Sequence, residues 1–569
     1  MKVFSGNKFL RLSTGLLVLF GAFLFACASV CVWVAPASAS TTAGGFTLST
    51  SSGDTPGEGT YSYSNGVLTI TAADNSSDPI SVKNANSKAT SDRIVVNPGE
   101  GKTAYVTLAG VTIDVSSVDS DIDSAAALLV SSGSLNLQLA SGSTNTLTSG
   151  RYRAGLQNGE HALTIKGAGS LAASSISKTA AKDGYGAGIG GGDGENGSNI
   201  TIEGSVTVTA TSSTNIADNS YSHGAGIGGG RNGDGTNITI KGSATVTATS
   251  SATSTSGRKD GSRGYSAAYG AGIGGGYDGD GTGITIAGNA TVTSTVSSKS
   301  KLSSYAFGAG VGGGYRGDGT NITISENASV TAKNQAECTN TGSSNQQSDA
   351  RANSFGAAIG GGYEGDANNL RIKGDAKVNA SNGATSSRKA GVSGNARSML
   401  TVVGAAGIGG GYAGAANGIK ISGGTINVTI PETSKGDPIG GGNRAIGTDT
   451  VTITGGSYAE DAVTSVGDST FVYGVELTYD GLSLELKDGR YQILGGPVDD
   501  DEDDSGESSG GGSGEGSGGG SGEGGSESGN KGFLPDTGAS AGILVAALVL
   551  SACLGAGIFM VTKRRGMEN

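Results

Sequence analysis

Apolar and polar residues alternate along most of the chain, and one short phrase carries the alternation. From Gly186 onward, "GAGIGGG" is followed by "NITI" and then by "TVTAT" or close variants of each. Apolar side chains at every second position are typical of a β-strand, whereas an amphipathic helix has a period of 3.6 residues. Each copy of the phrase therefore predicts three short strands.

The phrase recurs at irregular intervals, and the last copy is degenerate. Most of the difference in spacing lies in a Ser/Thr/Asn-rich stretch that closes each copy. Each unit is therefore predicted to have a fixed body and one variable loop, always at the same corner. The copies start at Gly186, Gly224, Gly270, Gly308, Gly356, Ala405 and Gly436.

One unit has too few apolar residues to build a core alone, but stacked units bury theirs against their neighbours. We expect a right-handed parallel β-helix, a solenoid with three strands per turn. A β-propeller is the alternative, although its blades need four strands and longer ones. One predicted buried ladder is Ile189, Ile227, Ile273, Val311, Ile359, Ile408 and Ile439, and another is Ile200, Ile238, Ile284, Ile322, Leu370 and Ile419.

The predicted repeat array covers residues 186–455, and the same alternation with less glycine predicts irregular turns over 94–185. Segments 40–93 and 456–498 are predicted to cap the two ends, and the second contains more large apolar residues and looks like a hairpin. Caps are expected because the open end of a solenoid exposes unpaired strand edges that promote aggregation.

The first 39 residues have the features of a secretory signal peptide. Basic residues precede a long apolar run, and Ala37-Ser38-Ala39 forms a small-residue cleavage site. An uncleaved N-terminal anchor is the alternative.

The other end of the chain resembles the cell-wall sorting signal of Gram-positive surface proteins. "LPDTG" is followed by an apolar run at 541–562, long enough to cross a bilayer, and then by "KRR". The resemblance implies that a sortase cleaves after Thr537 and joins it to peptidoglycan; a plain C-terminal membrane anchor is the alternative. The motif consists of Leu534, Pro535, Asp536, Thr537 and Gly538.

Residues 499–533 form an acidic Gly/Ser segment that we expect to be a disordered tether through the wall, because it has no apolar residue to bury before Phe533. The whole chain of 569 residues has a net charge of −12 and no basic stripe, which argues against a nucleic-acid partner. Cys338 is the only cysteine between the predicted processing sites, so no intrachain disulfide is expected.

The phrases "VTLAGVTIDV", "LNLQLASGSTNTLTSG" and "GAGIGGG…ITI…VTVTA" resemble the β-helical carbohydrate-binding domains of secreted bacterial proteins. The resemblance implies binding of plant-type or acidic polysaccharides together with calcium. It supplies no site motif that transfers residue by residue.

The turn after "GGG" repeats an acidic residue at its fourth position. Stacked carboxylates repel one another unless something compensates, and Ca²⁺ prefers such oxygen-rich loops. The alternative is that each aspartate caps its own turn by accepting backbone N–H groups. The candidate calcium ligands are Asp234, Asp280, Asp318 and Asp366.

The first position of the same turn is tyrosine in four successive units. Their rings would form a strip that stacks on sugars, or a self-packing ladder that only shields a corner. "RGD" at 316–318 matches an integrin motif, but the repeat itself dictates its Gly and Asp. The candidate sugar-binding residues are Tyr277, Tyr315, Tyr363 and Tyr412.

Together these features predict a cell-wall-anchored, adhesin-like protein that binds carbohydrate and is not an enzyme. A structural stalk without a ligand is one alternative. A β-helix polysaccharide lyase or hydrolase is another, but neither His161 nor His223 has an acidic partner at a convincing spacing in the sequence. The variable loops are expected to form a binding face or to have drifted neutrally.

Overall fold

The computed structural model describes residues 40–117, 125–177, 183–255, 264–340, 350–388, 399–466, 469–479 and 481–495. All of them lie in one compact unit, Met1–Asp500. The predicted signal peptide, the acidic tether, the "LPDTG" motif and the apolar span 541–562 lie outside the described residues. Within the described ranges, no helix is long and apolar enough to cross a membrane.

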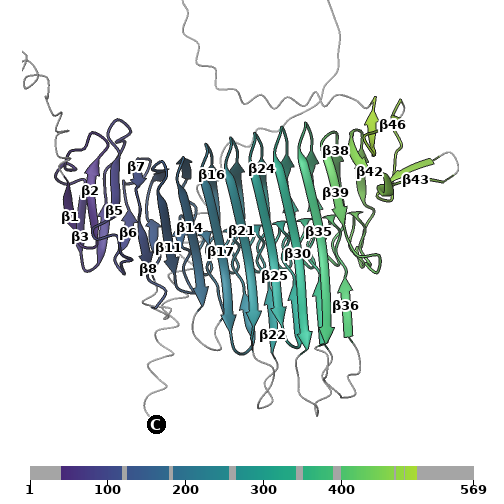
Figure 1. Cartoon of the computed structure of the whole chain (residues 1–569), viewed down its shortest axis with the longest axis horizontal. Coiled ribbons are helices and arrows are strands. Elements are labelled where there is room, and N and C mark those ends of the chain that lie inside the picture. The colour runs from purple at the N-terminus through teal and green to yellow at the C-terminus, as the bar shows by residue number, and fades with distance from the viewer. Residues whose placement is uncertain are drawn as a thin grey trace, which may run out of the picture. The chain divides into compact units, whose positions relative to one another are not determined.

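The described chain is all-β and is dominated by long parallel sheets. Its strands form sheets of 15, 12 and 12 strands, here called A, B and C, with smaller sheets of five and three strands, D and E. Figure 1 shows strands of successive coils lying side by side, from purple near the N-terminus to yellow-green near residue 495. This topology is the one expected of a β-solenoid, in which every coil adds one strand to each sheet.

Sheet A contains the "NITI" strands. Its members are β1 (Thr41–Ala43), β2 (Phe46–Thr50), β5 (Ile80–Asn84), β7 (Thr103–Leu108), β10 (Ser134–Leu139), β13 (Leu163–Gly167), β16 (Gly197–Ile202), β20 (Gly235–Ile240), β24 (Gly281–Ile286), β28 (Gly319–Thr320), β29 (Thr323–Ile324), β33 (Ala367–Asn368), β34 (Arg371–Ile372), β38 (Ala416–Ile421) and β41 (Thr450–Ile453).

Sheet B contains the short strands of the "GAGIGGG" phrase. Its members are β3 (Tyr61–Ser64), β4 (Val67–Ile70), β6 (Arg93–Val96), β9 (Leu128–Val130), β12 (Leu156–Gln157), β15 (Ile189–Gly190), β19 (Ile227–Gly228), β23 (Ile273–Gly274), β27 (Val311–Gly312), β32 (Ile359–Gly360), β37 (Ile408–Gly409) and β40 (Ile439–Gly440).

Sheet C contains the longest strands. Its members are β8 (Thr112–Asp114), β11 (Thr144–Ser149), β14 (Ser170–Ser177), β17 (Thr207–Ile216), β21 (Thr245–Ser254), β25 (Thr291–Ser300), β30 (Ser329–Asn340), β35 (Lys377–Arg388), β39 (Thr425–Thr429), β42 (Gly456–Ala459), β46 (Ser483–Lys487) and β47 (Arg490–Leu494).

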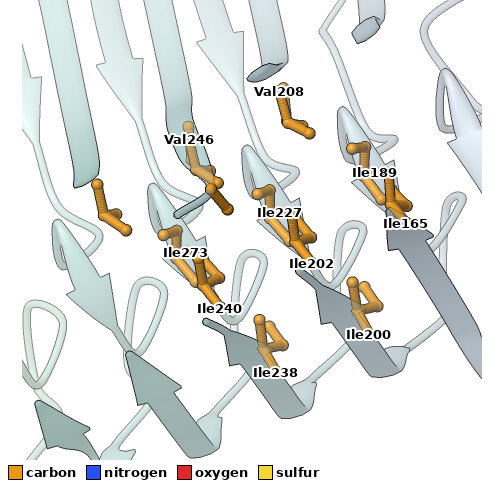
Figure 2. Close-up of a cluster of buried hydrophobic side chains, with 14 of the residues drawn as sticks. Ile165, Ile189, Ile200, Ile202, Val208, Ile227, Ile238, Ile240, Val246 and Ile273 are labelled. Atoms are coloured by element: carbon orange, nitrogen blue, oxygen red, sulfur yellow. The ribbon is translucent and has the colours of Figure 1, made fainter. Parts of the chain in front are cut away.

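Both predicted apolar ladders line the interior. Ile189, Ile227 and Ile273 pair in register along sheet B, and their side chains are fully buried. In Figure 2 these isoleucines form a row next to Ile165, Ile202 and Ile240 of sheet A, and Ile200 and Ile238 form the next row. Burying each such side chain contributes about 1.5–3 kcal/mol, and one continuous core connects the coils from Phe46 to Ile493. The ladders predicted from the alternation are confirmed.

The glycines of the phrase are required where coils touch. Gly360 has φ +130°, and a Cβ on it would lie 2.1 Å from the backbone oxygen of Gly409 in the next coil. Because a real Cβ never approaches an oxygen this closely, sheet B can stack only with glycine here. The same contact recurs at Gly190, Gly228, Gly274, Gly312 and Gly409.

The predicted variable loop of each unit is a β-strand over much of its length, so that prediction is wrong there. The Ser/Thr/Asn-rich stretches prolong the strands of sheet C and return as sheet D, which packs on that extension around a second small core. In Figure 1 β22 and β36 lie at the lower ends of the long strands. Period-two alternation of Ala, Ser and Val, as in β21, buries enough apolar surface to order them. Sheet D consists of β18 (Ser220–Ser222), β22 (Tyr265–Ala268), β26 (Ser303–Ala306), β31 (Ala350–Ser354) and β36 (Met399–Val403).

Antiparallel pairs lie at both ends of the parallel array. At the N-terminal end, β1 pairs with β2, β2 with β5, and β3 with β4. Parallel pairing begins with β4–β6 and β5–β7, earlier in the chain than residue 94. At the other end, β46 and β47 form an antiparallel hairpin beside β42, and sheet E follows the 3₁₀ turn η1 (Glu460–Ala462). Sheet E consists of β43 (Val463–Val466), β44 (Ser469–Val472) and β45 (Val475–Glu476).

Candidate binding surfaces

The four repeat tyrosines lie on the turn that joins sheet B to sheet A, and the structure brings them together as one column. The rings of Tyr277 and Tyr315 stack with centroids 5.2 Å apart, and those of Tyr315 and Tyr363 are also 5.2 Å apart. Tyr363 and Tyr412 stack at 5.6 Å. Each ring is half-buried, so one edge of the column faces solvent.

A second aromatic column packs against the first, and the sequence analysis missed it. Its rings belong to the residue just before each "GAG", and Tyr269 and Phe307 stack there with centroids 5.2 Å apart. Phe307 meets Tyr315 and Tyr363 edge to face, at 5.1 and 5.4 Å. An aromatic ring or histidine at this position in successive units was the available signal. The column consists of Tyr185, His223, Tyr269, Phe307 and Phe355.

We call the two columns together the aromatic strip, and its packing decides what a ligand can touch. Within the first column the ring faces cover one another, so a sugar cannot stack on an inner face. The hydroxyls of Tyr277, Tyr315, Tyr363 and Tyr412 have no hydrogen-bond partner among the described residues. Burial raises the pKa of Tyr315 and of Tyr363, so these hydroxyls stay protonated and can donate.

Charged side chains cover parts of the aromatic strip. Arg231 forms a two-pronged ion pair with Asp193, with both N–O distances 2.8 Å, and its guanidinium lies 4.1 Å from the ring centroid of Tyr185. At the far end, the guanidinium of Arg444 lies 5.6 Å from the ring centroid of Tyr412. These cation–π contacts cover outer ring faces and add to the stacking.

The second column contains a histidine with an acidic neighbour. His223 stacks on Tyr269 with centroids 4.9 Å apart, and its Nε2 lies 3.6 Å from Asp183 Oδ2. Asp183 and His223 belong to successive coils, and each lies just before its own copy of "GAG". Their separation in the sequence therefore did not reveal the pair. The other neighbours of His223 in the strip are the rings of Tyr185, Tyr269 and Tyr277.

The four aspartates form a column of their own, the aspartate column, and the structure gives each carboxylate a hydrogen-bond partner. Oδ1 of Asp280 accepts the backbone N–H of Asp318 at 2.8 Å, and Oδ1 of Asp318 accepts that of Asp366 at 2.8 Å. Asn196 and Asp234 make the same bond to the coil that follows each of them. The aspartates therefore do act as backbone caps, but each one caps the next coil rather than its own turn.

The carboxylates remain close to one another. Partial burial raises the pKa of Asp318, and the neighbouring Asp280 and Asp366 raise it further. The second oxygen of Asp318 accepts a hydrogen bond from Asn368 at 3.2 Å. Among the described residues, no group of three or more His, Cys, Asp or Glu is placed to hold a metal ion. The backbone N–H groups offset part of the repulsion between the carboxylates, and calcium binding stays a prediction.

The "RGD" sequence does not present its charges as a free motif. Arg316 pairs with Glu364 in the next coil at 3.2 Å, and its guanidinium lies 4.9 Å from the ring centroid of Tyr315. Asp318 belongs to the capping column. Both charged groups are therefore part of the coil-to-coil contacts, and the repeat pattern had accounted for the aspartate alone.

Comparisons with known proteins add no family to this picture. The chain matches no protein-family model, no curated protein and no solved structure.

Proposed function

We propose that this chain is a secreted protein that a sortase attaches to the peptidoglycan of a Gram-positive bacterium, where it binds an extracellular glycan. In this proposal the parallel coils form a right-handed β-helix that carries the aromatic strip along one corner. The protein acts by binding and carries out no catalysis.

The chain ends support the attachment. A leader with an A-x-A exit, an acidic Gly/Ser segment, "LPDTG", an apolar run and a basic tail follow one another in the order that sorting requires. Thr537 would carry the covalent link, and residues 499–533 would cross the wall as a flexible tether.

The row of tyrosine hydroxyls is the observation that carries the glycan proposal. Ring spacings of 5.2–5.6 Å place several donors in a line, next to apolar ring edges, on a rigid surface. Sugars present both hydroxyls and apolar C–H faces, so a chain laid along the strip can satisfy both. Because the inner faces are covered, contact is made with ring edges and hydroxyls.

Calcium would serve this proposal only through the second carboxylate oxygens of the aspartate column. Asp234, Asp280, Asp318 and Asp366 each have Oδ1 bonded to backbone, and Oδ2 of Asp318 also accepts a hydrogen bond from Asn368, so the Oδ2 atoms of Asp234, Asp280 and Asp366 would face a cation. A Ca²⁺ ion there would bridge neighbouring coils and need water for its remaining ligands.

A glycan array probed with residues 40–537 tests the binding, run with Ca²⁺ and again with EDTA. The matched variant is the double substitution Tyr315→Phe, Tyr363→Phe, which removes two hydroxyls and keeps the stacked rings. We expect wild-type binding to be at least about tenfold stronger than that of the variant. Absence of binding by the wild type in both buffers would refute the glycan proposal and favour a structural stalk.

The attachment is tested separately, in a Gram-positive host that expresses the full chain. Thr537→Ala should move the protein from the peptidoglycan fraction to the membrane and medium. A wall-bound Thr537→Ala variant would contradict sorting at this motif.

A further inference from the structure

A cavity of about 480 Å³ lies where the irregular coils meet the first glycine-rich copy. It arises from a difference in turn length between two neighbouring coils. Leu156 pairs with Ile189 and Leu163 with Ile200, yet Ile200 lies eleven positions after Ile189, whereas Leu163 lies seven after Leu156. The turn between Ile189 and Ile200 is therefore longer than the turn between Leu156 and Leu163 in the coil before it, and it extends beyond that shorter turn.

The copies that start at Gly224, Gly270, Gly308, Gly356 and Ala405 contain no such step, because equal turns stack directly on one another. A Cβ on Gly233 would lie 1.9 Å from the backbone oxygen of Glu195, and one on Gly279 would lie 2.0 Å from that of Gly233. In the copies from Gly224 to Ala405, each of which follows a matching turn, the third turn position is glycine. The first copy has no matching turn before it, so this position carries the side chain of Glu195, which lines the cavity.

Two buried amides line the cavity with acceptor oxygens that lack partners. Gln157 and Asn158 are only 3% and 1% exposed, and neither Oε1 of Gln157 nor Oδ1 of Asn158 has a hydrogen-bond partner among the described residues. Their NH₂ groups are already bonded, that of Gln157 to Glu195 at 2.6 Å and that of Asn158 to two backbone oxygens at 2.7 Å. Buried acceptors are costly unless a donor reaches them, and these two oxygens have almost no exposed surface, so the donor that fits them is a small one, such as a water beneath the occupant.

The remaining walls define the charge and polarity of that occupant. Glu195 forms an ion pair with Arg153 at 3.2 Å, which compensates its charge. Glu160 is exposed, and one of its oxygens accepts a hydrogen bond from Asn196 at 3.0 Å. Its charge has no cationic partner among the ion pairs of the described chain, so the mouth of the cavity is negative. Leu129 supplies an apolar surface.

We propose that this cavity is a subsite for one sugar residue without negative charge, either neutral or an amino sugar. Its hydroxyl or amine groups donate to Glu160, and a water beneath the sugar reaches the two amide oxygens. Its C–H face packs on Leu129. The inference rests on the proposed glycan binding, and it adds a second point of contact and a charge preference.

Saturation-transfer NMR on residues 40–537 tests the subsite, with N-acetylglucosamine, glucosamine, galactose and glucuronate as separate probes. Ser131→Trp fills the cavity from its exposed rim, and Ser297→Trp on the outer face of sheet C is the matched control. We expect at least one uncharged or amino sugar to bind and glucuronate not to. Ser131→Trp should weaken that binding at least about tenfold and Ser297→Trp should not.

Glu160→Lys supplies a second test, in which the sugar preference is expected to change and binding is not simply lost. Reversing the charge at the mouth should allow glucuronate to bind and should exclude glucosamine. Thermal unfolding of each variant shows whether the fold is kept. Equal binding of glucuronate and neutral sugars by the wild type would overturn the subsite, as would binding that Ser131→Trp leaves unchanged.

The subsite and the proposed function can fail separately. Array binding that depends on the strip tyrosines, without any monosaccharide signal in the wild type, would overturn the subsite alone. A monosaccharide signal that only Ser131→Trp abolishes, without strip-dependent array binding, would support the subsite and refute the role of the strip. Absence of both signals would refute both proposals.

Discussion

Oδ1 of Asp234 accepts a hydrogen bond from the backbone N–H of Asp280, at 2.9 Å, although 46 positions separate the two residues. Each residue occupies the fourth position of its turn, one coil apart. The same bond recurs down the column as far as Ala415, whose N–H bonds to Asp366 at 2.8 Å. A side chain therefore reinforces the stacking of turns at a place where the parallel sheets have no strand.

This bond predicts that an acceptor is needed at the fourth position and that a charge is not. Asp318→Asn keeps an oxygen for the N–H of Asp366, as Asn196 does naturally for Asp234. We expect Asp318→Asn to change the free energy of unfolding little, and Asp318→Ala to lower it by about 1–3 kcal/mol. Urea denaturation followed by circular dichroism measures both. Equal losses in the two variants would mean that the carboxylate charge is essential, as a bound cation would require.

The same column predicts an unusual dependence of stability on pH. The folded-state pKa of Asp318 is raised above its ordinary value, and burial also raises the pKa of Asp437 and of Asp278. The folded protein then binds more protons than the unfolded chain in a window just above pH 3.8. By linkage, these groups stabilise the fold as pH falls through that window and lose this contribution as pH rises.

Thermal unfolding at a series of pH values from 7 down to 4 measures this effect. The melting temperature of the wild type should hold or rise as the pH approaches 4, and Asp318→Asn should reduce the rise. A wild type that loses stability steadily over this range, with the variant unchanged, would contradict the assignment to this column.

Two glycine-to-alanine substitutions test whether the stacking of sheet B requires glycine. Gly360→Ala places a Cβ 2.1 Å from the oxygen of Gly409 at a φ of +130°, so we expect a loss of at least about 2 kcal/mol. A Cβ on Gly383 in β35 would meet no atom within 4 Å beyond its own chain neighbours. Gly383→Ala should be neutral or stabilise by about 0.4–1 kcal/mol. Similar effects of the two substitutions on urea unfolding would show that coil contact is not the reason for the glycine.

Cys338 is predicted to be inert in the folded protein. Its thiol is fully buried in the core between sheets C and D and lies 3.1 Å from the backbone oxygen of Leu302. Burial raises its pKa to about 11, so little thiolate exists at pH 8. A colorimetric thiol reagent should react with residues 40–537 only after denaturant is added. Rapid reaction of the native protein would mean that sheet D opens readily. Cys338→Ser gives the background.

The alternation of the repeats predicted most of the architecture. The inward positions of Ile189 and Ile200 were predictable because a strand places every second residue on one face. In coils of equal sequence, equivalent residues then meet in register. The glycine positions followed from the same regularity. The extent of sheet D was not predictable in this way, because stretches such as "SSATS" have the composition of a loop and become strands only when two of them pack together.

The candidate sites, too, were predictable from the sequence only in part. The sequence by itself determined which residues recur at the outward turn positions, since a repeat shows these as columns of aspartate and tyrosine. Only the tertiary structure decided what those columns contact: the backbone N–H of the next coil for aspartate, and other rings for tyrosine. The cavity beside Glu195 also required the fold, because it results from two turns of unequal length that become neighbours only when the coils stack.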